Sequence, residues 1–208
     1  MLLREHTLKQ FVEVLASDAP APGGGSAAAL NGALAAALVH MTGALTAGKE
    51  KYREFQAPMQ EIMNKAKDLQ NKLITGIDED TEAFNKVSAV FSMPKETPEQ
   101  KAARTQAMQA ALKAAAVTPL ETMQAAYQCL KLAEAAFGKT NTSCLSDFGS
   151  AVLFALAAVR SAWLNVKINL SGIKDEEYKA KTESQAREIL VSSEKLAEDL
   201  YNRIEQEL

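Results

Sequence analysis

Hydrophobic and polar residues recur every three or four positions along most of this 208-residue chain. This spacing gathers apolar side chains on one face of a helix. No segment shows the two-residue alternation that is typical of a β-strand between turns. The pattern predicts an all-α, single-domain bundle spanning residues 1–208, with about seven helices. They are expected over residues 6–17, 26–47, 58–92, 98–117, 119–137, 146–171 and 175–207.

Local signals support several of these boundaries. Thr7, Thr97 and Thr118 are each followed three residues later by Gln or Glu, which is the pattern of a capping box. Proline follows the last two threonines directly, at a position where its missing N–H costs a helix nothing. We therefore expect a helix to start after each threonine. Gly138 and Gly172 are expected to end the preceding helices in the left-handed conformation.

Composition narrows the class of protein further. Alanine supplies 37 of the 208 residues, and only 6% of the chain is aromatic. Alanine is the best helix former and is depleted from strands, so an all-β or disulfide-rich fold is excluded. The net charge of −3 argues against a nucleic-acid partner, which requires a clustered excess of Lys and Arg. With two cysteines and two histidines, no zinc-type or histidine-rich metal site is expected.

One segment raises the question of a membrane. Residues 26–47 carry no charge over 22 positions, which is long enough to span a bilayer. However, the segment consists mostly of Ala and Gly and contains Asn31, His40 and Thr42. We therefore expect the core helix of a soluble bundle and no membrane partner. The N-terminal residues lack a signal-peptide pattern, and the cysteines are expected to be unpaired, so we expect a cytoplasmic protein.

The first candidate site is the sequence PAPGGGS at residues 20–26, directly before the alanine-rich helix. Glycines allow a backbone to approach a ligand closely, and a helix N-terminus favours an anion. The motif lacks the Lys of a P-loop and the preceding strand of a dinucleotide-binding fingerprint. Two interpretations are equally supported. Either Ser26 caps a tight turn, or Gly23, Gly24, Gly25 and Ser26 contact a ligand.

The second candidate is Asp80. Continuing the apolar stripe of helix 58–92 through a gap in its middle gives Gly76 and Asp80, so this carboxylate is expected to face the core. Gly76 would leave space beside it, whereas Asp78, Glu79 and Glu82 are expected on the solvated surface. Burial raises the pKa of a carboxyl group toward the range useful for acid–base catalysis. The alternative is a structural aspartate that bonds a neighbouring helix. The apolar stripe consists of Ala66, Leu69, Leu73, Phe84, Val87 and Phe91.

The third candidate lies on helix 146–171. Asp147 and Asn165 are five helical turns apart and lie on one line, about 27 Å from each other. They therefore belong to different sites or to one long groove. The alternative is structural: Ser146 and Asp147 cap the helix, while Asn165 and Asn169 bond neighbouring helices.

A basic cluster follows the alanine-rich helix, at Lys49, Lys51 and Arg53. Cations at this position complement the helix dipole, which is the structural interpretation. The functional interpretation is a docking point for carboxylates at the mouth of a groove.

Together these segments resemble the cyclodeaminase domain of formimidoyltransferase-cyclodeaminase and its free-standing bacterial relatives, which include methenyltetrahydrofolate cyclohydrolases. The resemblance covers essentially the whole chain, and the combination and order of its motifs are specific. The loop at 138–143, GKTNTS, departs from the family, which often has a Gly-Asn pair there. The motifs are PAPGGGSAAA at 20–29, the basic stretch at 49–53, DEDTEAFNKV at 78–87, MPKETPEQKAAR at 93–104, LSD at 145–147 and LNVKINL at 164–170.

The resemblance implies a homodimeric enzyme that needs no cofactor and acts on a tetrahydrofolate substrate. In the implied reaction, N10 of 5-formimidoyltetrahydrofolate attacks the carbon on N5 and ammonia leaves, giving 5,10-methenyltetrahydrofolate. Asp80 occupies the place of the family's general acid/base. The implied substrate-binding residues are Gly23, Gly24, Gly25, Ser26, Lys49, Ser146, Asp147, Asn165 and Asn169.

Within this scheme the pterin is expected near Asp147. The carboxylates of the folate tail are expected at the glycine loop and at Lys49, Lys51 or Arg53. Two alternatives stay open. The first is a cyclohydrolase that opens the methenyl product to 10-formyltetrahydrofolate. The second is a catalytically inactive folate-binding or helical interaction protein.

Overall fold

A computed structural model describes residues 1–208 and consists of helices without strands, which confirms the all-α prediction. Short 3₁₀ turns lie at Leu3–Glu5, Glu50–Phe55 and Thr142–Cys144. The chain forms six α-helices, one fewer than expected. They are α1 (Leu8–Leu15), α2 (Gly24–Ala44), α3 (Gln56–Phe91), α4 (Pro98–Ala136), α5 (Leu145–Ser171) and α6 (Glu176–Glu207).

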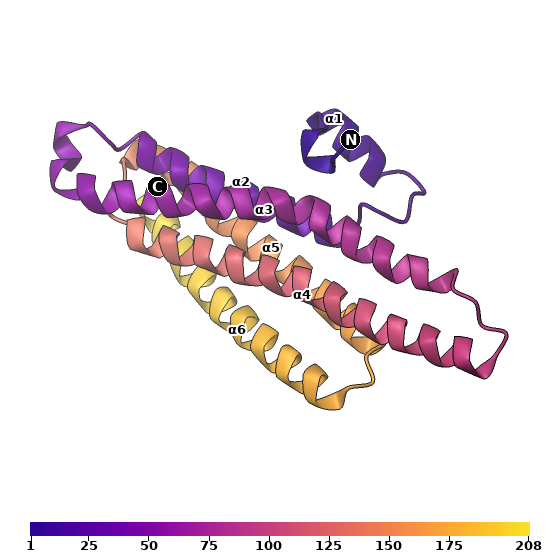
Figure 1. Cartoon of the computed structure of the whole chain (residues 1–208). Helices are drawn as coiled ribbons and strands as arrows, with labels where there is room; N and C mark the ends of the chain where they lie inside the picture. Colours follow the sequence, from indigo (N-terminus) through magenta and orange to yellow (C-terminus); the bar gives the residue numbers. More distant parts are fainter.

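Helices α2, α3, α4 and α5 form the centre of the bundle, and α6 packs against α4 and α5 (Figure 1). Helices α3 and α4 form an antiparallel pair whose hairpin projects past the start of α2. The short helix α1 lies beside the bundle and touches it mainly through Phe11, which is buried with Ala29 and Ile77. The hairpin end of α3 is therefore not covered by α2.

Helix α2 is buried through small residues. Its buried positions include Ala28, Ala29 and Gly32. A Cβ atom added at Gly32 would lie 2.9 Å from a methyl of Leu73, and one added at Gly43 would lie 2.6 Å from Met63. These distances are too short for a real side chain. The predicted close packing through Ala and Gly is therefore confirmed.

The predicted helices 98–117 and 119–137 are one continuous helix, α4, with Pro119 inside it. The expected start after Thr118 is wrong. Because proline has no N–H, the carbonyl of Ala115 loses its partner within the helix. The side-chain amide of Asn169 on α5 donates to this carbonyl at 3.0 Å. This bond, from a residue far along the chain, explains why the helix passes through the proline.

Of the other predicted helix boundaries, those marked by Thr7, Thr97 and Gly138 are confirmed, and the one marked by Gly172 differs. Capping boxes at Thr7 and Thr97 are confirmed, and Gly138 has the expected positive φ of 74°. Gly172 is not left-handed, since its φ is −90°. The missing side chain at position 172 instead allows close packing, because an added Cβ atom would lie 2.8 Å from a methyl of Leu112 on α4.

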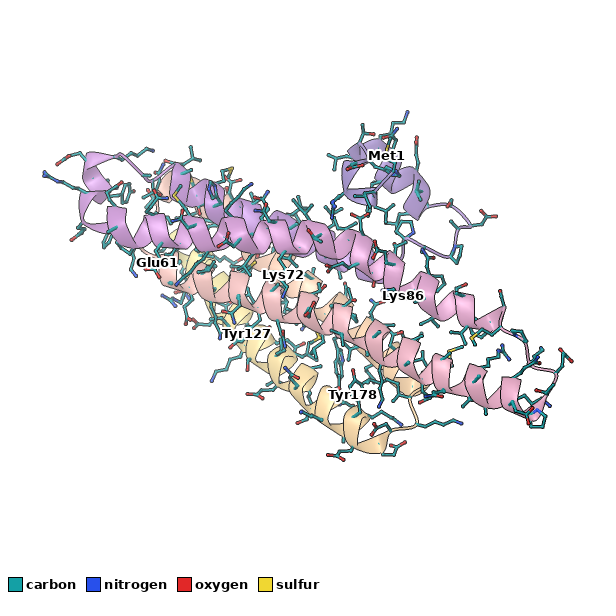
Figure 2. All side chains as sticks on the ribbon, in the orientation of Figure 1. Met1, Glu61, Lys72, Lys86, Tyr127 and Tyr178 are labelled. Atoms are coloured by element: carbon teal, nitrogen blue, oxygen red, sulfur yellow. The ribbon has the colours of Figure 1, made fainter.

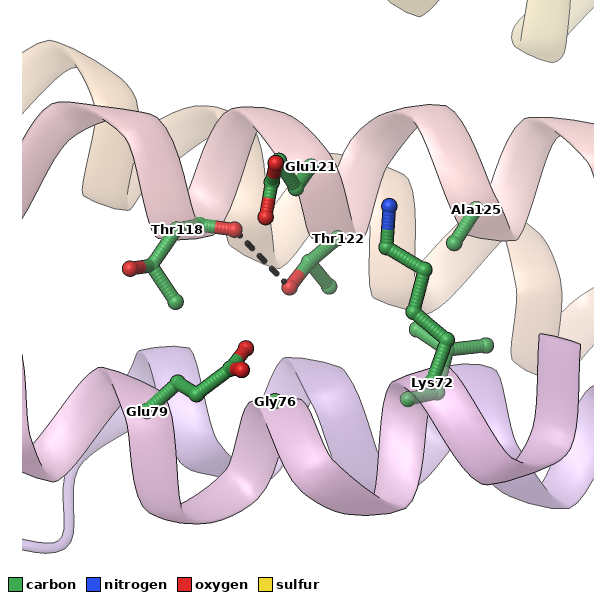
Figure 3. Close-up of a pocket in the computed structure, with 8 residues that line it drawn as sticks. Lys72, Gly76, Glu79, Thr118, Glu121, Thr122 and Ala125 are labelled. Atoms are coloured by element: carbon green, nitrogen blue, oxygen red, sulfur yellow. Dashed lines mark hydrogen bonds between the residues drawn. The ribbon is translucent and has the colours of Figure 1, made fainter.

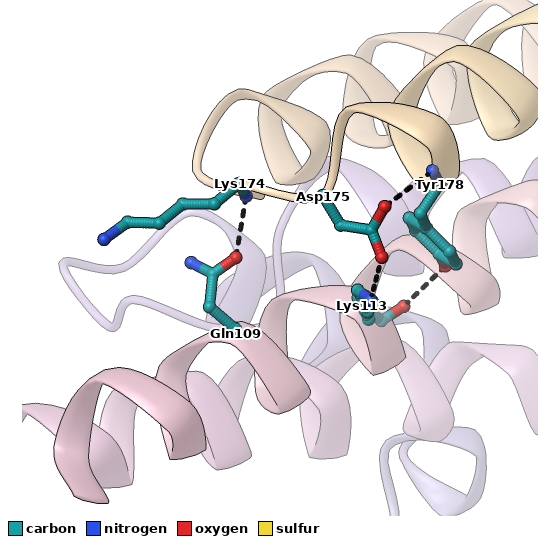
Figure 4. Close-up of polar contacts among 5 residues, drawn as sticks. All are labelled: Gln109, Lys113, Lys174, Asp175 and Tyr178. Carbon is teal, nitrogen blue, oxygen red and sulfur yellow. Dashed lines mark hydrogen bonds and ion pairs between the residues drawn. The ribbon is translucent and has the colours of Figure 1, made fainter. Parts of the chain in front are cut away.

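Polar contacts tie the turn between α5 and α6 to α4 (Figure 4). The Gln109 side chain accepts a hydrogen bond from the Lys174 N–H at 2.7 Å and donates to the Gly172 carbonyl at 2.9 Å. Asp175 accepts from Lys113 at 2.6 Å and from the N–H of Tyr178 at 3.0 Å. These bonds lower the pKa of Asp175 and fix the direction in which α6 begins.

Two helical segments, Gly24–Ala44 and Thr142–Ser171, are long and apolar enough to cross a membrane by length and composition alone. Half of the apolar stretch in each is buried inside the bundle. The core helix of a soluble protein meets the same criterion, and the two segments pack against each other in the bundle.

The bond between Asn169 and Ala115 yields a test of stability. We expect Asn169→Ala to lower the free energy of unfolding by about 1–3 kcal/mol, because it leaves the buried Ala115 carbonyl unpaired. In a Pro119→Ala background, the restored N–H of residue 119 bonds this carbonyl and the loss becomes smaller. Urea denaturation of the four proteins in this double-mutant cycle measures the difference. Equal losses in both backgrounds would contradict the assignment.

Candidate functional site

Asp80 meets the first turn of α2. Its carboxylate lies 3.1 Å from the Ser26 hydroxyl. A Cβ atom added at Gly25 would overlap the Asp80 carboxylate. Glycine at position 25 is therefore what allows the carboxylate to reach the backbone of α2. The predicted orientation of Asp80 toward the core is confirmed in part, since the side chain is half-buried.

The Ser26 hydroxyl joins several acceptors. It lies 2.9 Å from the carbonyl of Ile77 and 3.3 Å from the hydroxyl of Thr81, in addition to Asp80. A hydroxyl carries only one proton. When Ser26 donates to Ile77, its bond with Asp80 requires the carboxyl to be protonated. This small network therefore accommodates both protonation states of Asp80.

The pKa of Asp80 is raised above its ordinary value because burial penalises the charged form. Hydrogen bonds from the hydroxyl and backbone N–H of Ser26 oppose this shift but do not cancel it. Its raised pKa makes this carboxyl group better able to accept a proton and return it than an ordinary aspartate.

The glycine that makes room for Asp80 is not the expected one. Gly76 faces other neighbours, because an added Cβ atom would lie 3.6 Å from Ala29 and 3.9 Å from Thr122. These are ordinary contacts. The space beside Asp80 comes instead from Gly25, on a different helix. No periodicity within α3 could have identified it.

The start of α2 also differs from the expected cap. Gly23 is the N-cap and makes no side-chain hydrogen bond, and the helix begins at Gly24. Ser26 is thus inside the first turn rather than capping it. The free N–H groups and the dipole of α2 favour an anion at this end. Asp80 already supplies that negative charge.

Asn165 on α5 adjoins the same turn. Its amide nitrogen would lie 3.4 Å from a Cβ atom at Gly24 and donates to the Ser161 carbonyl at 2.9 Å. The amide oxygen stays free to accept a hydrogen bond from a ligand. Asn169, one turn later, is engaged with Ala115 as described above, as the structural interpretation expected.

Asp78 corrects another expectation. It was expected on the solvated surface, yet it is only 6% exposed. Its carboxylate accepts a hydrogen bond from the N–H of Leu3 at 2.6 Å and lies 3.6 Å from the Arg4 guanidinium. The N-terminal segment covers this face of α3. The residues of α3 alone do not reveal this cover. Asp78 therefore anchors that segment, whereas Asp80, two residues later, faces α2.

The stripe that leads to Asp80 is only half core-facing. Leu73 is buried, but Phe84 is 39% exposed and Phe91 is 64% exposed. These aromatic residues lie on the part of α3 that continues past the start of α2, near Lys86 in Figure 2. The expectation that they pack into the core is wrong, because no helix of this chain covers them.

The remaining predicted residues are not brought to Asp80. Lys49 follows the end of α2, whereas Gly25 and Asp80 meet at its start, about 30 Å away along a helix of this length. Ser146 and Asp147 lie in the first turn of α5, and the N-cap there is Cys144 without a side-chain bond. Their predicted capping role is wrong.

Contacts of the loop at 138–145 explain its position at that end of the bundle. Asn141 donates its N–H to the Thr46 hydroxyl at 2.8 Å, and Thr142 donates to the Tyr52 hydroxyl at 3.3 Å. The loop thus ties the end of α2 to the segment that follows it.

Both cysteines are free and buried, and burial raises the pKa of Cys129 to about 12. Cys129 therefore stays a neutral thiol.

One polar pocket escaped the sequence analysis. Lys72, Glu79 and Glu121 line it between α3 and α4, beside the bond from Thr122 to the Thr118 carbonyl (Figure 3). Its volume of about 10 Å³ suits a single water molecule. Four larger grooves on the surface have volumes of about 320 to 410 Å³. Neither Asp80, Gly24 nor Asn165 lines any of these four.

Known proteins include relatives of this chain. The sequence model of the family described as formiminotransferase-cyclodeaminase matches residues 7–188. A methenyltetrahydrofolate cyclohydrolase of Methylorubrum extorquens is 39% identical, over 97% of each chain. The formimidoyltransferase-cyclodeaminase of Rattus norvegicus is 32% identical over 90% of this chain, which spans 35% of that longer protein.

The fold has a solved counterpart. The crystal structure of formiminotetrahydrofolate cyclodeaminase from Thermotoga maritima superposes with a TM-score of 0.83 and 28% sequence identity. The match covers 99% of this chain and 97% of that one.

The contact at Gly25 yields a second test. Alanine is the better helix former, so a neutral site would gain stability from Gly→Ala. We expect Gly25→Ala instead to lower the free energy of unfolding by about 1–3 kcal/mol, because its methyl displaces the Asp80 carboxylate from Ser26. Gly76→Ala is the matched control, since Gly76 lies inside α3 and an added Cβ atom there meets only ordinary contacts, at 3.6 and 3.9 Å. Similar stabilities of the two variants in urea denaturation would contradict this account.

Proposed function

Because this chain belongs to the formiminotransferase-cyclodeaminase family of folate-processing enzymes, we propose that it is a 5-formimidoyltetrahydrofolate cyclodeaminase. The observation that carries the proposal is the position of Asp80. This half-buried carboxyl group, with its raised pKa, lies at the start of α2 between Ser26 and the glycines of the loop. It is the group best placed in this cluster to move a proton.

The proposed reaction joins N10 to the carbon on N5. The substrate carries a protonated formimidoyl group, and the new N10–carbon bond gives a tetrahedral adduct. Asp80 accepts the proton of N10 and delivers it to the departing amino group. The carbon–nitrogen bond then breaks, releasing ammonia and the 5,10-methenyl cation. Since the steps are addition, proton transfer and elimination, they require no metal or redox cofactor.

The charge of Asp80 assists in a second way. The reacting carbon is cationic before N10 adds and again after ammonia leaves, so the ionised carboxylate stabilises both of these states. Gly23 and Gly24 leave the backbone open to the folate ring, and the free amide oxygen of Asn165 accepts a hydrogen bond from it. Orientation of N10 against the carbon supplies the rest of the acceleration.

A second reaction deserves equal testing because of one comparison. The relative with 39% identity over nearly the full length is named a methenyltetrahydrofolate cyclohydrolase. In that reaction, water adds to the methenyl carbon while Asp80 accepts one proton of the water. Asp80 then returns this proton to N5 as the N5–carbon bond breaks, and the remaining hydroxyl proton passes to solvent as the carbonyl of 10-formyltetrahydrofolate forms. Both reactions share the methenyl species and the same carboxylate.

Turnover of the two folates separates these activities. We expect ammonia release from 5-formimidoyltetrahydrofolate, with growth of the methenyl absorbance. Faster loss of that absorbance from supplied 5,10-methenyltetrahydrofolate, without ammonia, would favour the cyclohydrolase. In either case Asp80→Asn is expected to lower turnover by about 100-fold or more. Tight binding without turnover of either folate would refute both activities.

The stability of Asp80→Asn provides a control, because the substitution is expected to lower activity without lowering stability. The folded protein binds the Asp80 proton more tightly than the unfolded chain, because the folded pKa is raised. Ionised Asp80 therefore costs stability at neutral pH, and this cost disappears as the pH falls through its pKa. Asp80→Asn is expected to be at least as stable as the parent at pH 7, with the difference shrinking in acid. Its loss of activity is then not a loss of fold.

We also propose that the protein is a cytoplasmic homodimer. The neighbouring helices α2 and α5 both carry large apolar side chains that are more than a third exposed. In a two-fold pairing, each copy would cover this face of the other. The exposed apolar residues on these two helices are Leu34 (41%), Leu153 (48%), Phe154 (37%), Leu164 (65%) and Ile168 (71%).

Charge placed on this face tests the pairing. We expect Leu34→Glu combined with Phe154→Glu to convert the dimer into a folded monomer, because both carboxylates would be buried at the interface. Val191→Glu on α6 is the matched control, since Val191 is 59% exposed and lies on another helix. Sedimentation equilibrium measures the mass. A parent protein that is already monomeric, or a double variant that stays dimeric, would refute the proposed interface.

A further inference from the structure

The exposed aromatic stripe of α3 begins at the candidate site. Asp80, Phe84, Val87 and Phe91 follow one another at spacings of four, three and four residues, so they share one face of the helix. Asp80 is level with the start of α2, and the residues after it project beyond that start. Phe84 is 39% exposed and Phe91 is 64% exposed. An apolar track therefore leads away from the carboxylate.

This track ends in a basic groove at the hairpin between α3 and α4. The groove has a volume of about 320 Å³, and Phe91 belongs to both the stripe and the groove. Three cations and no acid line it. The lining residues are Phe91, Lys95, Lys101, Arg104, Thr105 and Met108.

The three cations differ in what they already bind. Arg104 donates to the carbonyls of Val90 and Phe91, at 3.1 and 3.4 Å, and so caps the end of α3. Lys95 and Lys101 have no carboxylate within ion-pairing distance. The neighbouring Glu99 is occupied at the start of α4, where its own N–H and the Thr97 hydroxyl lower its pKa. The two lysines therefore remain free for an external anion.

We propose that Lys95 and Lys101 bind the glutamate carboxylates of the folate tail, with the p-aminobenzoyl ring lying along Phe84 and Phe91. This inference rests on the proposed folate substrate and names where its tail lies. Asp80 to Phe91 measures about 16 Å along the helix axis. An extended p-aminobenzoylglutamate and a lysine side chain together cover that distance.

The two alternative places for the tail are weaker in this structure. At the glycine loop, Asp80 already supplies the negative charge and would repel a second carboxylate. Lys49 lies about 30 Å away along α2, at the opposite end of the same chain. Phe84, Val87 and Phe91 instead lie between Asp80 and the groove at Lys95 and Lys101, on one face of α3.

The experiment compares substrates with and without the tail. Full-length protein is assayed with 5-formimidoyltetrahydrofolate and 5,10-methenyltetrahydrofolate, with their triglutamate forms, and with the pteroate analogue of each, which lacks glutamate. We expect Lys95→Ala combined with Lys101→Ala to raise KM for the glutamylated substrates about five- to tenfold, with kcat unchanged. KM for the pteroate analogues should not move. The effect on glutamylated substrates should shrink at high salt, because salt screens exposed charges.

A matched control is Lys131→Ala combined with Lys195→Ala. These two lysines line another groove, against α6, in which Glu134 and Asp199 balance their charge. We expect KM for every substrate to stay unchanged in this variant. Phe91→Ala is expected to raise KM for all the substrates, including the pteroate analogues, because those analogues keep the aromatic ring.

Several results would overturn the proposal. One is an equal change in KM for glutamylated and tail-free substrates in the Lys95/Lys101 variant. Another is a tail-specific loss in Lys49→Ala combined with Lys51→Ala but not in the groove variant. A third is a change of oligomeric mass in the groove variant, which would make the groove an interface between copies.

Calorimetric binding of tetrahydrofolate triglutamate and tetrahydropteroate keeps the test independent of turnover. Preferential binding of the triglutamate that disappears in the Lys95/Lys101 variant supports the tail site even if neither reaction occurs. Equal binding of the two ligands by the parent protein rejects the tail site, even if the proposed reaction is confirmed.

Discussion

The close approach of α2 to α3 at Gly25 is the constraint on which the candidate site depends. A single methyl group at this position would overlap the Asp80 carboxylate. With glycine there, the first turn of α2 receives the carboxylate directly, and Ser26 bridges it to the Ile77 carbonyl. The same small-residue surface continues at Gly32 and Gly43, so the whole helix lies close to α3. Site geometry and core packing are thus consequences of one short separation between helices.

Helical periodicity predicts that Asp80 faces the core side of α3, but it does not predict which residues surround this side chain. A period of three to four residues identifies which side chains share a face of α3. It carries no information on how far a neighbouring helix extends along that face. Leu73 is buried because α2 covers it, whereas Phe84 and Phe91 are exposed because α2 begins level with Asp80. Asp78 shows the converse case, in which the N-terminal segment buries a residue that periodicity assigns to the surface.

Local start and stop signals are confirmed at Thr7, Thr97 and Gly138 but fail at Gly172 and at Thr118. The capping boxes at Thr7 and Thr97 close within four residues and are present. Thr118 and Pro119 carry the same signal, yet α4 continues through them. The deciding bond comes from Asn169, 54 positions away from the Ala115 carbonyl that it satisfies. A proline therefore ends a helix only if no other part of the fold supplies the missing donor.

The opposite charges at the two ends of the apolar track favour one orientation of the proposed ligand. In the proposed complex, Asp80 would attract the cationic one-carbon unit at one end of the apolar track, and Lys95 and Lys101 would attract carboxylates at the other. The ends are about 16 Å apart, which exceeds the screening length of about 8 Å at physiological salt. Each charge therefore acts on the nearest part of the ligand with little interference from the other. A folate bound the other way round would place its carboxylates against Asp80 and its cation against two lysines. The polarity of the track then selects the orientation in which N5 and N10 reach the carboxyl group.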